Sequence, residues 1–154
     1  MRAVGYQKPG PISDEASLLD IELPRPEPEG HDILVAVKAV SVNPVDTKVR
    51  RRAGPERGSW KVLGWDAAGI VAATGPEVSL FKTGDAVYYA GAIDRQGTNA
   101  EFHLVDERIA GRKPSTQSFA EAGRRPTPPR RLLWAAPTNQ FRSRRSSPWR
   151  IMPA

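Results

Sequence analysis

Prolines and glycines interrupt this chain at short intervals and limit each regular element to a few residues. The 154 residues include 15 prolines and 13 glycines. Proline lacks the backbone donor that a sheet needs, and both residue types favour turns. The apolar stretches between them have the length and the branched side chains that are typical of strands. We expect strands over residues 2–7, 19–23, 32–42, 62–74, 86–90 and 99–106.

Two of these strands should lie inside the domain. Residues 32–42 (DILVAVKAVSV) are apolar on both faces, which is typical of a central strand. Residues 62–74 (VLGWDAAGIVAAT) are rich in alanine and glycine, which predicts close packing against a neighbouring strand. Tyr88 and Tyr89 alternate across residues 86–90, so one of them should face the core.

A short helix is predicted directly after residues 32–42. Asn43 is a good N-cap, Pro44 suits the first helical position, and Asp46 favours the positive end of the helix dipole. The helix should stop near Gly54. A second helix begins within residues 118–122 with a capping box.

The balance of many short strands and little helix favours a β-barrel-like domain over a βαβ unit. The sequence predicts that this domain covers residues 1–122, because the composition changes abruptly after it. Residues 1–122 carry 15 Lys/Arg and 17 Asp/Glu, whereas residues 123–154 carry eight arginines and no acid. The second segment is proline-rich and lacks apolar periodicity, so we expect an irregular, disordered tail.

Two interpretations of residues 123–154 remain open. Arginine without lysine, many prolines and scattered tryptophan are typical of GC-rich DNA translated out of frame, which suggests a frameshift near Gly123. Alternatively, the arginines together with Trp134, Phe141 and Trp149 would bind nucleic acid through phosphate contacts and stacking. No RRM, KH or zinc-finger pattern supports that alternative, so we do not expect a nucleic-acid partner.

Cysteine is absent from the chain, which excludes disulfides, thiol catalysis and cysteine-ligated zinc. The N-terminus lacks the apolar core of a signal peptide, and no apolar run approaches the ~20 residues that span a bilayer. We therefore expect a cytoplasmic protein with no membrane partner.

Several motifs resemble the N-terminal domain of the medium-chain dehydrogenases/reductases, in the zinc-type alcohol dehydrogenase and quinone oxidoreductase branch. They are the Asn-Pro helix start in residues 36–50, the GWDAAG strand and Gly-Asp turn in residues 62–91, and the NAEFHLVDERI segment in residues 97–122. The resemblance implies a mainly β fold, a GroES-like, partly open antiparallel β-barrel with short helices. It also implies that a complete relative continues into a domain that binds NADP(H) or NAD(H) and reduces a carbonyl, quinone or activated alkene.

The resemblance does not extend to the metal. Zinc-dependent relatives have cysteine at the position of Asn43 and a His-Glu pair where this chain has Trp65 and Asp66. Zinc prefers thiolate and imidazole ligands, and neither is present at these positions. We therefore expect no zinc, and the implied activity is quinone or enone reduction.

The candidate cleft residues are Asn43, Asp46, Trp65 and Asp66. Asn43 either donates to a substrate oxygen or caps the helix. Asp46 is better suited to a helix start or an ion pair than to acid-base work. Trp65 either lines the pocket or fills the core. His103 should be packed or hydrogen-bonded, His31 should be solvated, and we predict no catalytic residue or metal site.

The 154 residues contain no G-x-G-x-x-G or P-loop motif. We therefore expect this chain by itself to bind no cofactor and to be inactive, as an N-terminal piece of a zinc-independent NAD(P)H-dependent oxidoreductase. A non-catalytic GroES-like interaction module is the other alternative, and the exposed cleft surface would favour self-association.

Overall fold

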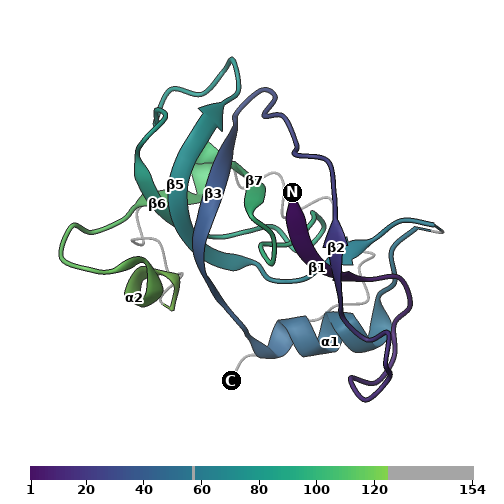
Figure 1. Ribbon diagram of the computed structural model, residues 1–154. Coiled ribbons are helices and arrows are strands. Elements are labelled where there is room, and N and C mark those ends of the chain that lie inside the picture. The colour runs from purple at the N-terminus through teal and green to yellow at the C-terminus, as the bar shows by residue number, and fades with distance from the viewer. Residues whose placement is uncertain (57, 125–154) are drawn as a thin grey trace, which may run out of the picture.

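The computed structural model describes residues 1–56 and 58–124, which form two antiparallel sheets (Figure 1). The smaller sheet has the strand order β2-β1-β4, and the larger has the order β7-β3-β5-β6-β8. The strands of the described residues are β1 Arg2–Tyr6, β2 Leu19–Glu22, β3 Asp32–Ser41, β4 Lys61–Val62, β5 Asp66–Thr74, β6 Ala86–Ala90, β7 Phe102–Asp106 and β8 Ala110–Arg112.

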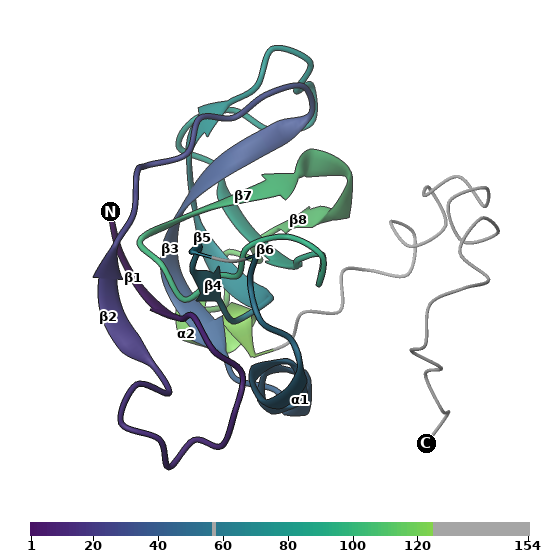
Figure 2. The ribbon, with the colours of Figure 1, turned by 90° about the vertical axis from the view of Figure 1, so that its right-hand side faces the viewer.

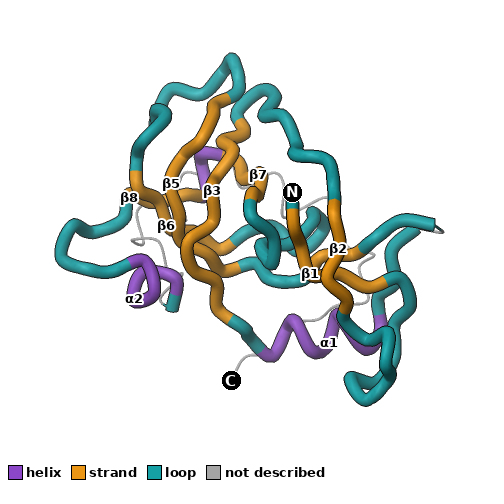
Figure 3. Tube along the Cα trace, in the orientation of Figure 1, coloured by secondary structure: helices purple, strands orange, loops and turns teal. Residues whose placement is uncertain are grey.

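Within residues 1–56 and 58–124, three short helical segments accompany the sheets: α1 Pro44–Arg52, the 3-10 turn η1 Glu107–Ile109, and α2 Phe119–Gly123. Figure 3 draws the helices in purple. Both predicted helices are confirmed. In α2 the Ser118 N–H donates to Glu121 Oε2 (2.8 Å), and the Glu121 N–H donates to Ser118 Oγ (3.2 Å). No helix among the described residues is long and apolar enough to cross a membrane.

The two sheets meet along the segment before β7, which closes part of the barrel wall. Ala3 and Ala100 form an isolated bridge, and the Glu101 N–H donates to Arg2 O (3.0 Å). Figure 2 shows β1 and β2 standing beside the larger sheet. The predicted GroES-like, partly open antiparallel fold with short helices is confirmed.

β3 is the central strand, as predicted, because it pairs with β5 on one edge and with β7 on the other. The core between the strands contains buried residues of five strands, namely Ile33, Val35, Ala67, Val71, Val87, Tyr89, Val105 and Ala110. Gly69 allows the close packing predicted for its strand, since a Cβ there would lie 2.3 Å from Ala36 O.

The prediction of one continuous strand over residues 62–74 was wrong. The chain turns at Gly64, whose φ of +90° is the left-handed conformation that glycine tolerates, and this turn separates β4 from β5. β7 also begins later than predicted, at Phe102, and the short strand β8 was not predicted. The predictions for the basic tail concern residues beyond 124 and lie outside the described residues.

Candidate functional site

The start of α1 is where the candidate residues meet. Asn43 has extended backbone (φ −125°, ψ 162°) and Pro44 occupies the first turn, so the predicted N-cap position is correct. The Asn43 N–H donates to Asp46 Oδ2 (2.6 Å), and the Asp46 N–H donates to Asn43 O (2.9 Å). These two bonds fix the angle at which the chain leaves β3 and enters α1.

Asp46 is buried, and both of its oxygens accept backbone donors. Its Oδ2 accepts from Asn43, and its Oδ1 accepts the Gly64 N–H (2.8 Å). The carboxylate therefore holds the first turn of α1 against the turn between β4 and β5. This geometry agrees with the expected role at the helix start and leaves little capacity for acid-base chemistry.

The Asn43 side chain does not turn back onto the helix; its Nδ2 donates to Asp66 Oδ2 at the first residue of β5. Burial raises the pKa of the Asp66 carboxyl above its ordinary value. The hydrogen bond from Asn43 opposes that rise, and the nearby Asp46 carboxylate adds to it. The site is therefore an amide–carboxyl pair in which the charged form of Asp66 is disfavoured.

Trp65 belongs to the core. It is 5% exposed and clusters with Tyr6 and Leu63, while Val45 and Val49 of α1 pack against the same cluster. Its indole Nε1 has no hydrogen-bond partner among the described residues. Of the four candidate residues, the structure thus brings Asn43, Asp46 and Asp66 together and places Trp65 beneath them as packing.

The loop of residues 96–99, to which the sequence analysis assigned no role, supports this site through the turn at Gly64. The Gly97 N–H donates to Val62 O (3.0 Å), and the Thr98 N–H donates to Gly64 O (2.7 Å). A Cβ at Gly64 would lie 2.6 Å from Thr98 Oγ1, so the turn and the loop fit only without a side chain there. A glycine inside an otherwise apolar run was the signal that could have revealed this close approach.

A buried Tyr89–His103 pair holds the same loop in place. The Tyr89 hydroxyl is 3.0 Å from His103 Nδ1, and His103 Nε2 is 3.0 Å from Gln96 O. Since a carbonyl can only accept, Nε2 carries the proton and Nδ1 accepts from the hydroxyl. Burial lowers the pKa of His103 to about 4 and raises the pKa of Tyr89. The expectation that His103 is hydrogen-bonded within a strand is confirmed.

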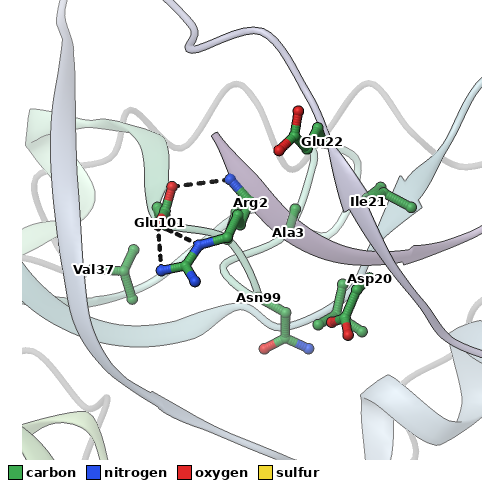
Figure 4. A pocket seen from close by; sticks show the side chains of 10 residues that line it. Arg2, Ala3, Asp20, Ile21, Glu22, Val37, Asn99 and Glu101 are labelled. Atoms are coloured by element: carbon green, nitrogen blue, oxygen red, sulfur yellow. Dashed lines mark hydrogen bonds and ion pairs between the residues drawn. The ribbon is translucent and has the colours of Figure 1, made fainter.

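An open groove of about 620 Å³ lies elsewhere, between β1, β2 and the segment before β7. In Figure 4 the Arg2 guanidinium pairs with Glu101 at its edge (2.8 Å). Alanine, valine and isoleucine side chains also line this groove. None of the four candidate residues does, so the groove and the α1 site are separate features.

Comparison with known proteins shows the family. Residues 29–122 match the alcohol dehydrogenase GroES-like domain, and the chain belongs to that family. The chain is 46% identical over 123 residues to a zinc-type alcohol dehydrogenase-like protein of Staphylococcus aureus strain COL. That match covers 79% of this chain and 36% of the relative.

Solved structures give the same result. A Rhizobium etli protein named for the zinc-dependent alcohol dehydrogenases is 70% identical, with a TM-score of 0.79, over 82% of this chain and 36% of that chain. The Escherichia coli quinone oxidoreductase, solved with NADPH, is 29% identical with a TM-score of 0.67, over 80% of this chain and 36% of its own. The chain thus spans about a third of the length of these relatives, and the predicted family is confirmed.

The names of these relatives raise the question of whether the site fits zinc. Among the described residues, no three His, Cys, Asp or Glu side chains are grouped to hold a metal ion. Asn43 and Asp66 are hydrogen-bonded to each other, and Asp46 is bound to two backbone donors. An amide and a half-buried carboxyl of raised pKa are poor zinc ligands beside thiolate and imidazole. The residues present therefore do not fit the ion.

Proposed function

We propose that residues 1–122 are the substrate-side domain of a zinc-independent, NAD(P)H-dependent oxidoreductase that reduces quinones or enones. The Asn43–Asp66 hydrogen bond carries this proposal, because it joins an amide to a carboxyl where zinc-dependent relatives have metal ligands. The family match and the quinone oxidoreductases among the similar structures support the reaction class.

Asn43 is the residue proposed to meet the substrate. A primary amide has two N–H donors, and Asp66 accepts only one of them. The second donor is therefore available to a carbonyl oxygen. Asp66 fixes the orientation of the amide, and Asp46 fixes the backbone that carries it. A nicotinamide bound by the rest of a full-length protein would supply the hydride.

A domain exchange tests this proposal. Residues 1–122 would replace the matching segment of the Rhizobium etli protein, whose 70% identity makes a compatible interface reasonable. We expect NADPH-dependent reduction of quinones or enones that survives a chelator. Asn43→Ala should lower kcat about 100-fold if its donor stabilises the developing oxyanion. Thr47→Ala, on the exposed side of the same helix, is the matched control.

Two outcomes would contradict the proposal. One is an exchange protein that reduces its substrates only when zinc is added. The other is an Asn43→Ala variant that keeps the kcat of the Thr47→Ala control.

We further propose that the 154-residue polypeptide by itself does not bind a nicotinamide cofactor or catalyse the reaction. A dinucleotide needs a glycine-rich turn and a helix N-terminus for its pyrophosphate, and the sequence contains no such motif. Titration of NADPH fluorescence with the purified chain should show no saturation. Saturable binding at micromolar concentration would contradict this part of the proposal.

The domain boundary at residue 122 and the cytoplasmic location remain part of the same proposal. The partner is a small carbonyl or quinone, and no nucleic acid or membrane is expected. Self-association of the isolated domain through its exposed cleft surface is also proposed, and the exposed Val42 side chain beside the start of α1 supports it. Filter binding of RNA and DNA at two salt concentrations, with and without residues 123–154, tests the nucleic-acid alternative.

A further inference from the structure

His31 lies at the end of the barrel opposite α1, because it precedes β3 and α1 follows it. Its two ring nitrogens face two carboxylates. Nδ1 is 3.1 Å from Glu107 Oε1, and Nε2 is 3.2 Å from Glu77 Oε2. Since Glu77 follows β5 and Glu107 begins η1, these contacts connect three segments that are distant in sequence.

Glu107 is buried, and its carboxylate holds a loop over the core. Its Oε2 accepts the Ser79 N–H (3.0 Å) and the Leu80 N–H (2.7 Å). On either side of these two residues, Val78 and Phe81 pack against the main hydrophobic cluster. The loop of residues 75–81 therefore covers one end of the core, and Glu107 fixes it there.

We propose that His31 holds this loop in place through both carboxylates only while its imidazole ring is protonated. We call this arrangement the His31 clasp. An imidazolium donates from both nitrogens and satisfies both carboxylates. A neutral imidazole has one N–H, so one of the two contacts would bring a nitrogen lone pair against a carboxylate. Loss of the proton therefore breaks one contact and loosens residues 75–81. This inference goes beyond the proposed function and does not depend on it.

The broken contact is the one to Glu77. The Glu107 side chain is 2% exposed, whereas that of Glu77 is 64% exposed. A nitrogen lone pair facing a buried carboxylate costs more than one facing an exposed carboxylate, whose charge water screens. Neutral His31 therefore keeps its proton on Nδ1, facing Glu107, and Glu77 becomes free.

The other charged groups near His31 are already paired. Asp106 binds the Arg108 guanidinium (2.5 Å), and Asp32 forms a bidentate ion pair with Arg95 (2.6 and 2.9 Å). The chain has two histidines, and burial lowers the pKa of His103 to about 4. The imidazole signals of His31 can therefore be distinguished from those of His103 by NMR.

Two measurements on the full 154-residue chain test the clasp. Nitrogen-15 NMR of the imidazoles across the titration should show both His31 nitrogens protonated at low pH and only Nδ1 protonated at high pH. Amide exchange, expressed as protection relative to the intrinsic rate at each pH, should show about threefold weaker protection of Ser79 and Leu80 once His31 is neutral, the scale of a partly exposed ion pair.

His31→Gln is the matched variant, and its loop protection should not change over the same pH range. Three results would overturn the inference: loop protection in the natural sequence that stays constant through the His31 titration, a His31→Gln variant with the same pH dependence, or a neutral His31 protonated on Nε2. The NMR result needs no variant, so it decides the matter even if the substitution impairs folding.

Discussion

Two hydrogen-bonded polar pairs of this domain lie in different surroundings. Tyr89 and His103 are buried, and both imidazole nitrogens have partners. Asn43 and Asp66 are only partly buried, and one Asn43 N–H and Asp66 Oδ1 have no partner among the described residues. A saturated pair in the core can only stabilise the fold, whereas a half-open pair with a spare donor can bind a ligand. The difference identifies the second pair as the candidate site.

The largest expected loss of stability comes from removing Asp46, which holds the backbone around the half-open Asn43–Asp66 pair. Asp46→Ala leaves the Asn43 and Gly64 N–H groups without their acceptor. We expect the free energy of unfolding to fall by about 4 kcal/mol, roughly 2 kcal/mol for each orphaned donor. Urea unfolding measures this loss. Thr47→Ala is the control, and equal stability of the two variants would show that Asp46 does not hold the site.

The buried pair should make stability depend on pH. His103 has a pKa of about 4 in the fold against an ordinary value of 6.5, so below pH 6.5 the unfolded chain binds more protons. The free energy of unfolding should therefore fall as the pH drops from 6.5 to about 4, by about 3 kcal/mol. The difference between the natural chain and His103→Gln isolates this contribution. A difference that is constant with pH would rule it out.

Loss of the Tyr89 hydroxyl should lower the free energy of unfolding by less than loss of the Asp46 carboxylate. Tyr89→Phe leaves His103 Nδ1 buried without a donor. The expected loss is about 2 kcal/mol of unfolding free energy, measured by urea unfolding at neutral pH. Tyr88→Phe, on the other face of β6, serves as the control. If the two variants are equally stable, the Tyr89–His103 bond contributes nothing.

Changing the half-open Asn43–Asp66 pair itself should have the smallest effect on the free energy of unfolding. Asp66→Asn removes a carboxyl whose charged form is disfavoured by burial and by Asp46, so its unfolding free energy at neutral pH should change by less than about 1 kcal/mol. A functional pair need not stabilise the fold. A loss as large as that of Asp46→Ala in the same unfolding assay would reclassify Asp66 as structural.

Local sequence signals predicted what depends on local geometry. The Asn43 helix start, the Ser118 capping box and the central strand β3 all follow from neighbouring residues, and all three are present. The turn that divides residues 62–74 into β4 and β5 was not predictable in the same way. It lies at Gly64 and depends on a loop more than 30 residues later.

The long-range partners in the site were also beyond sequence reasoning. Asn43 was placed correctly as an N-cap, but no pattern indicated that its side chain would bond to Asp66. Trp65 adjoins Asp66 in sequence, yet it packs among Tyr6 and Leu63. Neighbouring residues at a strand start face different surroundings, and only the packing of α1 decides which one reaches the site.

Isothermal titration of zinc into the purified chain tests the central claim most directly. Because Asn43 occupies one oxygen of Asp66 and no thiolate or imidazole accompanies the pair among the described residues, we expect no saturable uptake at neutral pH. Binding of one zinc ion per chain that disappears in Asp66→Asn would contradict the account of a zinc-independent site.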